Sequence, residues 1–202
     1  TKEFLQFLVL SKPAGLNATE VNNKILYDKG ILKGTAQAFI DAGNRYNINE
    51  AYLIAHTLHE TGNGTSILAS GVPVDKNGNV TRNSRGEIAE TSNTKHIVYN
   101  MYGYGARDSC PIECGAKYAF NRGWFTPSAA IRGGAESVST NYIQAGQDTL
   151  YKMKWNPDNP GTHQYATHVQ WAVAQTNRIH EIYNLLNNYI MEFDVPKFLG
   201  QP

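Results

Sequence analysis

Residues 47–66 read NINEAYLIAHTLHETGNGTS, and this stretch decides the fold. Asn49 fits the N-cap position of a helix with Glu50 just inside it, and apolar residues follow at helical spacing. Those on one face are Leu53, Ile54, Thr57 and Leu58. Gly62 and Gly64 then stop the pattern. The stretch predicts a helix that ends at the acid Glu60, next to a glycine-rich turn.

The position of Glu60 has a chemical consequence. The negative end of the helix dipole disfavours an ionised carboxylate there, and burial in an aromatic groove would raise its pKa further. A carboxyl group that stays protonated near neutral pH is what a general acid needs. The alternative is that Glu60 is an ordinary solvated residue at a helix end.

Further helices are predicted on both sides of this stretch. Asn17-x-x-Glu20 has the form of a capping box, and residues 34–47 carry apolar side chains at helical spacing. Pro111, with Asp108 or Ser109 as cap, opens another helix, and Thr126 followed by Pro127 opens the next. After a segment broken by prolines and glycine, residues 169–190 restore a long amphipathic period.

Residues 71–94 differ from this helical pattern. They place Asn77-Gly78 between short β-prone pieces and contain almost no large apolar side chain, which predicts an exposed hairpin or flap. The predicted fold class is α+β and mostly helical, with about seven helices around a cleft and this flap beside it.

The composition argues against some classes of partner and favours others. The 202 residues form one domain by expectation, and a net charge of +1 argues against a nucleic-acid partner. The 12 Tyr and 3 Trp suit a groove that binds sugar, although core packing is the alternative use for aromatic residues. No apolar run is long enough to span a membrane. Because the sequence begins with Thr1 rather than Met, we expect a piece excised from a larger, exported protein.

Cysteine and histidine give weak signals. Cys110 and Cys114 are expected to be free thiols near a helix start, with a local disulfide or a metal pair as alternatives. Among six histidines no His-Glu-x-x-His spacing occurs. His56 and His59 share a helix face but have no identifiable third ligand, so neither a metal nor any other cofactor is expected.

Three long phrases carry a family resemblance. They are HETGNGTSILASG (59–71), VYNMYGYGARDSCP (98–111) and GGAESVSTNYIQAGQDTLYKMKWNPDNPGTHQYATHVQWA (133–172). In this order they resemble the glucosaminidase domains of bacterial autolysins in glycoside hydrolase family 73, over about residues 50–175. The resemblance implies a lysozyme-like fold with an α-lobe and a β-hairpin flap, secretion to the cell wall, and hydrolysis of the β-1,4 bond after N-acetylglucosamine in peptidoglycan.

The resemblance also assigns catalytic residues. Glu60 falls on the family's general acid, and Tyr165 matches a tyrosine that lines the catalytic centre. The phenol of Tyr165 could hydrogen-bond the substrate acetamido group or a water. From the residues alone, Tyr165 at a helix start is equally well read as a packing residue.

Substrate-binding residues follow more loosely from the phrase beside Glu60. We expect contributions from Asn100, Tyr102, Tyr104 and Asp108, and further ones from Gln147, Trp155 and Gln164. Asp108 is read equally well as a helix N-cap. Trp155 could instead close the core over the proline-rich loop that follows it.

A second carboxylate is the open point of the mechanism, because most glycosidases need two. Asp75, Glu87 and Glu90 in the flap are the candidates, and Glu87 and Glu90 are the two that we retain as possible partners, with solvated surface charges as the alternative. The substrate offers another route, in which its own 2-acetamido oxygen attacks the anomeric carbon. Our hypothesis is substrate assistance, with Glu60 as acid and then base and Tyr165 orienting the acetamide.

Other functions are compatible with the same sequence. They are cleavage of the other glycosidic bond by a muramidase, non-hydrolytic cleavage by a lytic transglycosylase, and binding of the wall without catalysis. We expect a monomer whose partner is the glycan strand of peptidoglycan.

Overall fold

The computed structural model of the chain describes residues 1–197 and residue 200. Within them, eight α-helices and one two-stranded sheet form the fold, which confirms the predicted mostly helical α+β class. The helices are α1 (Ala18–Lys24), α2 (Ala36–Tyr46), α3 (Glu50–Glu60), α4 (Ile67–Ser70), α5 (Pro111–Asn121), α6 (Pro127–Val138), α7 (Leu150–Trp155) and α8 (Trp171–Leu185). Shorter helical turns are η1 (Lys2–Phe7), η2 (Gly30–Leu32) and η3 (Ser139–Ile143).

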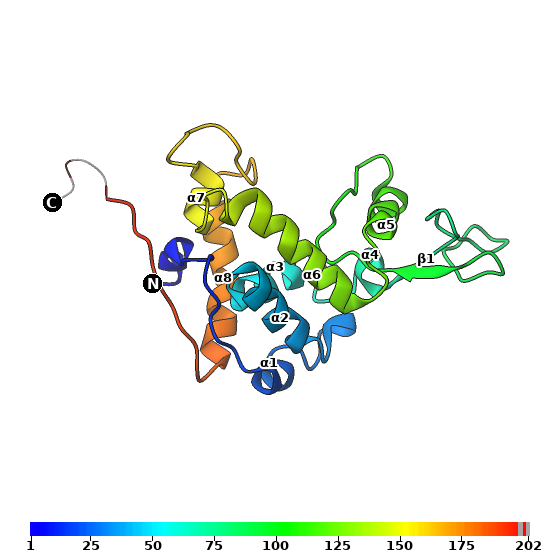
Figure 1. Cartoon of the computed structure of the whole chain (residues 1–202), viewed down its shortest axis with the longest axis horizontal. Helices are drawn as coiled ribbons and strands as arrows, with labels where there is room; N and C mark the ends of the chain where they lie inside the picture. Colours follow the sequence, from blue (N-terminus) through cyan, green and yellow to red (C-terminus); the bar gives the residue numbers. More distant parts are fainter. Residues whose placement is uncertain (198–199, 201–202) are drawn as a thin grey trace.

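Helix α3 is the central element of the helical body. It packs against α2 and α8 (Figure 1). Every residue from Glu50 to Leu58 is buried. The predicted cap is present, since the side chain of Asn49 accepts a hydrogen bond of 3.1 Å from the backbone N–H of Tyr52. A helix buried along its length holds its last residue, Glu60, in a fixed position relative to the core.

The first turn of α3 also anchors the N-terminal segment. The Glu50 carboxylate is buried and accepts hydrogen bonds from the backbone N–H groups of Ala14, Gly15 (3.2 Å) and Leu16 (3.4 Å). Buried donors of this kind need partners, and one carboxylate supplies all three.

The turn after α3 is built from residues with left-handed backbones. Gly62, Asn63 and Gly64 have φ values of 56°, 60° and 79°. A Cβ atom at Gly64 would lie 2.2 Å from the carbonyl oxygen of Lys29, so only glycine lets these two segments pack together. The side chain of Asn63 accepts a 3.0 Å hydrogen bond from Arg178 on α8. The chain beyond Glu60 is therefore fixed from both sides.

The flap is a pair of nested hairpins. Strands β1 (Val72–Val74) and β2 (His96–Val98) pair antiparallel, and isolated bridges join Val74 to Val80 and Arg82 to Ile88. The hairpin predicted at Asn77-Gly78 is confirmed, although the paired strands continue to Val98, beyond the predicted limit of 94. In Figure 1 this segment projects away from the helical body beside α4 and α5.

The start of α5 corrects two expectations. Cys110 and Cys114 form a disulfide with a Cα–Cα distance of 5.4 Å, so the free-thiol expectation is wrong. One helical turn brings the two residues to the same side, and the backbone N–H of Cys114 donates to the carbonyl of Cys110. Pro111 opens the helix as predicted, but the N-cap is Cys110 rather than Asp108 or Ser109.

The predicted cap of α6 is present, because the side chain of Thr126 accepts a hydrogen bond from the backbone N–H of Ala129.

The last two helices, α7 and α8, lie on either side of the loop that carries Tyr165. Tyr165 lies in the irregular segment between α7 and α8, not at a helix start, because α8 begins only at Trp171. Helix α8 also ends at Leu185, before the predicted limit of 190. Within residues 1–197 and 200, no helix is long and apolar enough to cross a membrane.

Candidate active site

Glu60 occupies the last position of α3, with its side chain accessible to solvent. The protein atoms around it still remove part of its hydration, and this raises the pKa of the Glu60 carboxyl above its ordinary value. The neighbouring His59 opposes the shift. A carboxyl group with a raised pKa, open to solvent and fixed by a buried helix, can donate a proton and later accept one.

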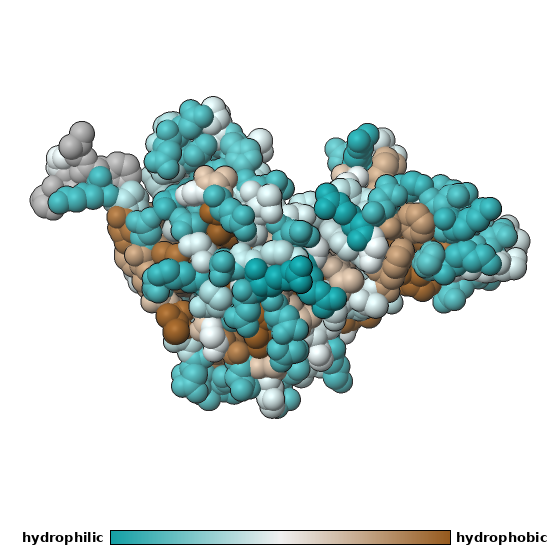
Figure 2. Space-filling view, in the orientation of Figure 1, coloured by the Kyte–Doolittle hydropathy of each residue, from teal (hydrophilic) through white to brown (hydrophobic). Residues whose placement is uncertain are grey.

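A cavity of about 200 Å³ opens beside Glu60. Its other walls come from the turn into α4, from the chain after β2 and from α5, through Ser66, Ile67, Leu68, Asn100, Gly103 and Ile112. Figure 2 shows a hollow in the upper outline of the molecule, between the loop after α7 and the region of α5. The cavity itself offers a concave surface next to the carboxyl group.

His56 lies one helical turn before Glu60, on the same face of α3. It is buried, and its Nε2 atom lies 3.1 Å from the hydroxyl oxygen of Tyr165. Burial lowers the pKa of His56 from 6.5 to about 4, with a smaller contribution from His59. A neutral imidazole therefore joins the loop of Tyr165 to the helix of Glu60.

The other ring nitrogen of His56 indicates how this hydrogen bond is directed. In the described part of the chain Nδ1 is buried without a hydrogen-bond partner. A buried N–H without a partner is less common than a buried acceptor without one. This favours the tautomer in which Nε2–H donates to Tyr165, which leaves the phenolic proton of Tyr165 free to face the groove.

Aromatic rings hold Tyr165 in place. Its ring lies 4.7 Å from Trp171 and 4.9 Å from Tyr142, measured between centroids. Tyr102 stacks on the ring of His56 at 5.5 Å. Burial raises the pKa of Tyr104 and of Tyr165, so both phenols keep their protons, and the charge of Glu60 makes a smaller contribution in the same direction.

Asn100 organises the wall of the cavity through its amide. Its nitrogen donates to the carbonyls of Tyr104 (2.8 Å) and Gly115 (3.1 Å), and its oxygen accepts from the backbone N–H groups of Tyr102 and Tyr104. The amide therefore shapes the loop that carries the two tyrosines. A substrate that contacts this amide would have to share atoms that are already hydrogen-bonded to the backbone.

Gln147 has a similar supporting position, away from the cavity of Glu60. It is buried, donates to the carbonyls of Lys152 and His163, and lies 2.6 Å from Nδ1 of His163. His163 in turn stacks on Tyr142 at 4.6 Å, and Tyr142 packs against Tyr165. Gln147 thus braces the loop that carries Tyr165.

Sequence reasoning missed Lys154, a buried cation that fixes the same loop. Its ammonium donates to Gln164 (3.2 Å) and to the carbonyls of Ala166 (2.8 Å) and Thr167 (3.3 Å). It also lies 4.9 Å from the ring centroid of Trp155, which is exposed at the end of α7. A lysine at the end of a helix gives no sign of this role in the sequence, because its acceptors lie 10 to 13 residues later.

The acids of the flap and the exposed Asp108 lie outside this cluster. Glu87 is hydrogen-bonded to Asn83 within its own hairpin, and Glu90 is exposed. Asp75 accepts from the backbone N–H groups of Asn77 and Asn79. Neither they nor Asp108 are among the residues that line the cavity of Glu60.

No group of three or more His, Cys, Asp or Glu side chains that could hold a metal ion occurs among residues 1–197 and 200. His56 is committed to Tyr165, and His59 next to it is exposed.

Comparison with known proteins gives matches over the same region. Residues 36–185 match the family model of mannosyl-glycoprotein endo-beta-N-acetylglucosaminidase. A beta-N-acetylglucosaminidase of Bacillus subtilis is 52% identical over 201 residues, which are 98% of this chain and 20% of that protein. This chain therefore spans about a fifth of the length of that relative.

Solved structures also match most of the chain. The crystal structure of a major bifunctional autolysin has a TM-score of 0.74 at 40% identity, over 96% of this chain and 73% of that one. Two structures of autolysin E from S. aureus are 31% identical. One holds the muropeptide NAM-L-Ala-D-iGlu (TM-score 0.74, 98% and 81% covered). The other is a catalytic glutamate-to-alanine mutant with the disaccharide NAG-NAM (TM-score 0.71, 94% and 78% covered). These matches confirm the lysozyme-like fold that the resemblance implied.

Proposed function

The chain belongs to the glucosaminidase family of glycoside hydrolases, and we propose that it cleaves the β-1,4 bond after N-acetylglucosamine in the glycan strands of peptidoglycan. The observation that carries the proposal is Glu60, a carboxyl group with a raised pKa that lines a cavity at the end of a buried helix. The complex of a glutamate mutant of autolysin E with NAG-NAM supports it, since that enzyme has the same fold.

In this proposal Glu60 is the general acid. Its proton goes to the glycosidic oxygen as the bond to the anomeric carbon breaks, and the carboxylate that remains then takes a proton from the attacking water. Partial burial of Glu60 serves this role, because it raises the pKa of the carboxyl group. A fraction of Glu60 therefore stays protonated at a pH at which a solvated glutamate is ionised.

The second group is the substrate itself. The acetamido oxygen of N-acetylglucosamine attacks its own anomeric carbon, and water later opens the cyclic intermediate. Tyr165 orients the acetamide by donating its phenolic proton, and the hydrogen bond from His56 holds that phenol in place. Glu87 is hydrogen-bonded within its own hairpin and Glu90 is exposed, which supports this mechanism over one with two carboxylates.

We also propose where the domain acts and in which oligomeric state. The domain acts as a monomer on the cell wall after export, as one module of a longer protein. The walls of its groove are formed or supported by Tyr102, Tyr104, Gln164 and Trp155. Asp108 contacts the glycan strand outside the cavity. A muramidase, a lytic transglycosylase and a wall-binding module are the alternatives.

Digestion of purified cell walls tests whether the domain is an enzyme. We expect soluble fragments and new reducing ends to appear in proportion to enzyme and time. A chelator should leave the rate unchanged, because Glu60 and the acetamide need no metal ion. Tight binding to walls without release of reducing ends would contradict the proposal and favour the wall-binding module.

A further inference from the structure

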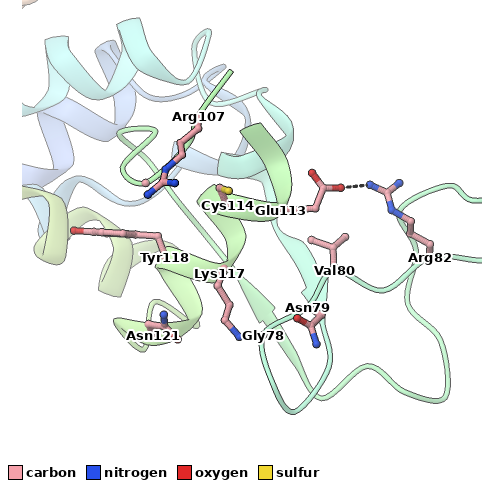
Figure 3. Close-up of a pocket in the computed structure, with 11 residues that line it drawn as sticks. Gly78, Asn79, Val80, Arg82, Arg107, Glu113, Cys114, Lys117, Tyr118 and Asn121 are labelled. Atoms are coloured by element: carbon pink, nitrogen blue, oxygen red, sulfur yellow. Dashed lines mark hydrogen bonds and ion pairs between the residues drawn. The ribbon is translucent and has the colours of Figure 1, made fainter. Parts of the chain in front are cut away.

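A second and larger cavity, of about 580 Å³, lies between the flap and α5. Arg82 and Gly78 reach it from the flap, Arg107 from the loop before α5, and Glu113, Lys117 and Tyr118 from α5 itself (Figure 3). None of the residues that line it lines the cavity of Glu60. It is therefore a cavity distinct from the one beside Glu60.

The walls of this cavity are positively charged. Its one acidic residue, Glu113, is paired with Arg82 at 2.5 Å, the contact drawn as a dashed line in Figure 3. Lys117 donates to the backbone carbonyl of Asn77 and forms no ion pair with any of the residues that the structure describes. In the described part of the chain Arg107 makes no ion pair. Cavities lined by one sign of charge concentrate ligands of the opposite sign.

One acid outside the cavity reduces this charge only in part. The pKa of Asp75 is low chiefly because the backbone and side chain of Asn79 donate to it, and Lys117 makes a smaller contribution. Asp75 is therefore held mainly by donors of its own turn, Asn77 and Asn79. A positive balance remains across the opening.

The cavity has fixed walls. The Cys110–Cys114 disulfide closes the first turn of α5, and Cys114 is itself part of the wall. A Cβ atom at Gly105 would lie 2.5 Å from the Tyr118 side chain, so glycine lets the loop of Arg107 lie directly on α5. The basic groups are therefore presented by a preformed surface.

The two cavities are lined by residues that are close together in the sequence. Gly103 lines the cavity of Glu60, and Gly105 lines the basic one. At the start of α5, Ile112 lines the cavity of Glu60, and Glu113 lines the basic one. A polymer bound at Glu60 can therefore place a branch in the basic cavity. The muropeptide held by autolysin E shows the chemistry of such a branch, a short peptide that ends in the acidic iGlu.

We infer that the basic cavity binds a carboxylate of the peptide attached to the glycan strand, through Arg107 and Lys117. This inference rests on the proposed function, and it adds a preference for strands that still carry their peptides. Guanidinium and ammonium groups bind carboxylates by charge-assisted hydrogen bonds, which weaken as salt screens them.

The test compares two substrates. Glycan strands with intact peptides and the same strands freed of peptides by an amidase, both stripped of phosphate polymers, are digested by wild type and by the double variant Arg107→Gln/Lys117→Gln. We expect kcat/KM of the variant to fall about fivefold on peptide-bearing strands, as for two partly exposed charge contacts, and to stay unchanged on bare strands. High salt should reduce the wild-type preference in the same way.

Arg85→Gln is the matched control, since it removes a cation from the same flap outside the cavity and should leave both rates unchanged. Equal losses on both substrates, or no loss on either, would overturn the inference. A loss seen only when phosphate polymers are left on the walls would also overturn it. Wild type that cleaves both strands at one rate removes this inference alone, whereas wild type that cleaves neither removes the proposed function as well.

Discussion

Replacement of Glu60 by glutamine is expected to lower kcat on peptidoglycan about a thousandfold, because general acid catalysis by a positioned carboxyl is lost. Glutamine has the same shape but cannot release a proton to the leaving oxygen. The side chain is exposed at the end of a helix whose other residues are untouched, so the thermal unfolding midpoint should stay close to that of wild type. Initial rates of reducing-end release, measured beside the unfolding curve, check both parts.

The flap acids provide the controls for this variant. Glu87→Gln and Glu90→Gln make the same chemical change at positions outside the cavity, so each should retain most of the wild-type activity. If either abolished turnover as completely as Glu60→Gln, the substrate-assisted mechanism would have to be abandoned in favour of two enzyme carboxylates.

Acidification is expected to destabilise the fold through His56. Burial lowers the pKa of His56 from 6.5 in the unfolded chain to about 4 in the folded one, so the unfolded state binds the proton more tightly. The stability that this group contributes is complete above its unfolded pKa and is lost as the pH falls through about 4. The total is about 3 kcal/mol, which chemical denaturation at a series of pH values can measure.

A non-titrating residue at the same position separates this effect from that of the carboxyl groups. In His56→Gln the free energy of unfolding should fall less between pH 7 and pH 4, and the difference from wild type should approach the contribution of His56. His168→Gln, at an exposed histidine, should follow the wild-type curve. Parallel curves for wild type and His56→Gln would show that His56 is not held neutral by burial.

Much of the fold could be predicted because its signals are local. The caps at Asn17, Asn49 and Thr126 and the turn at Asn77-Gly78 each involve residues within four positions of one another. The cysteine pair was mispredicted because a spacing of four is also compatible with free thiols. Its bond depends on the conformation of the first turn of α5, which the sequence leaves open.

The site was predictable only in part for the same physical reason. The position of Glu60 follows from its own helix and turn, whereas the hydrogen bond between His56 and Tyr165 joins residues that are 109 positions apart. The supporting roles of Lys154 and Gln147 likewise depend on how the loop after α7 folds back. No helical or strand period in the sequence encodes such contacts.

The central claim is the identity of the bond that is cleaved, and mass spectrometry of borohydride-reduced digestion products tests it most directly. The account predicts fragments whose reduced end is N-acetylglucosamine. Fragments that end in reduced muramic acid, or in an anhydro sugar that borohydride does not reduce, would contradict it.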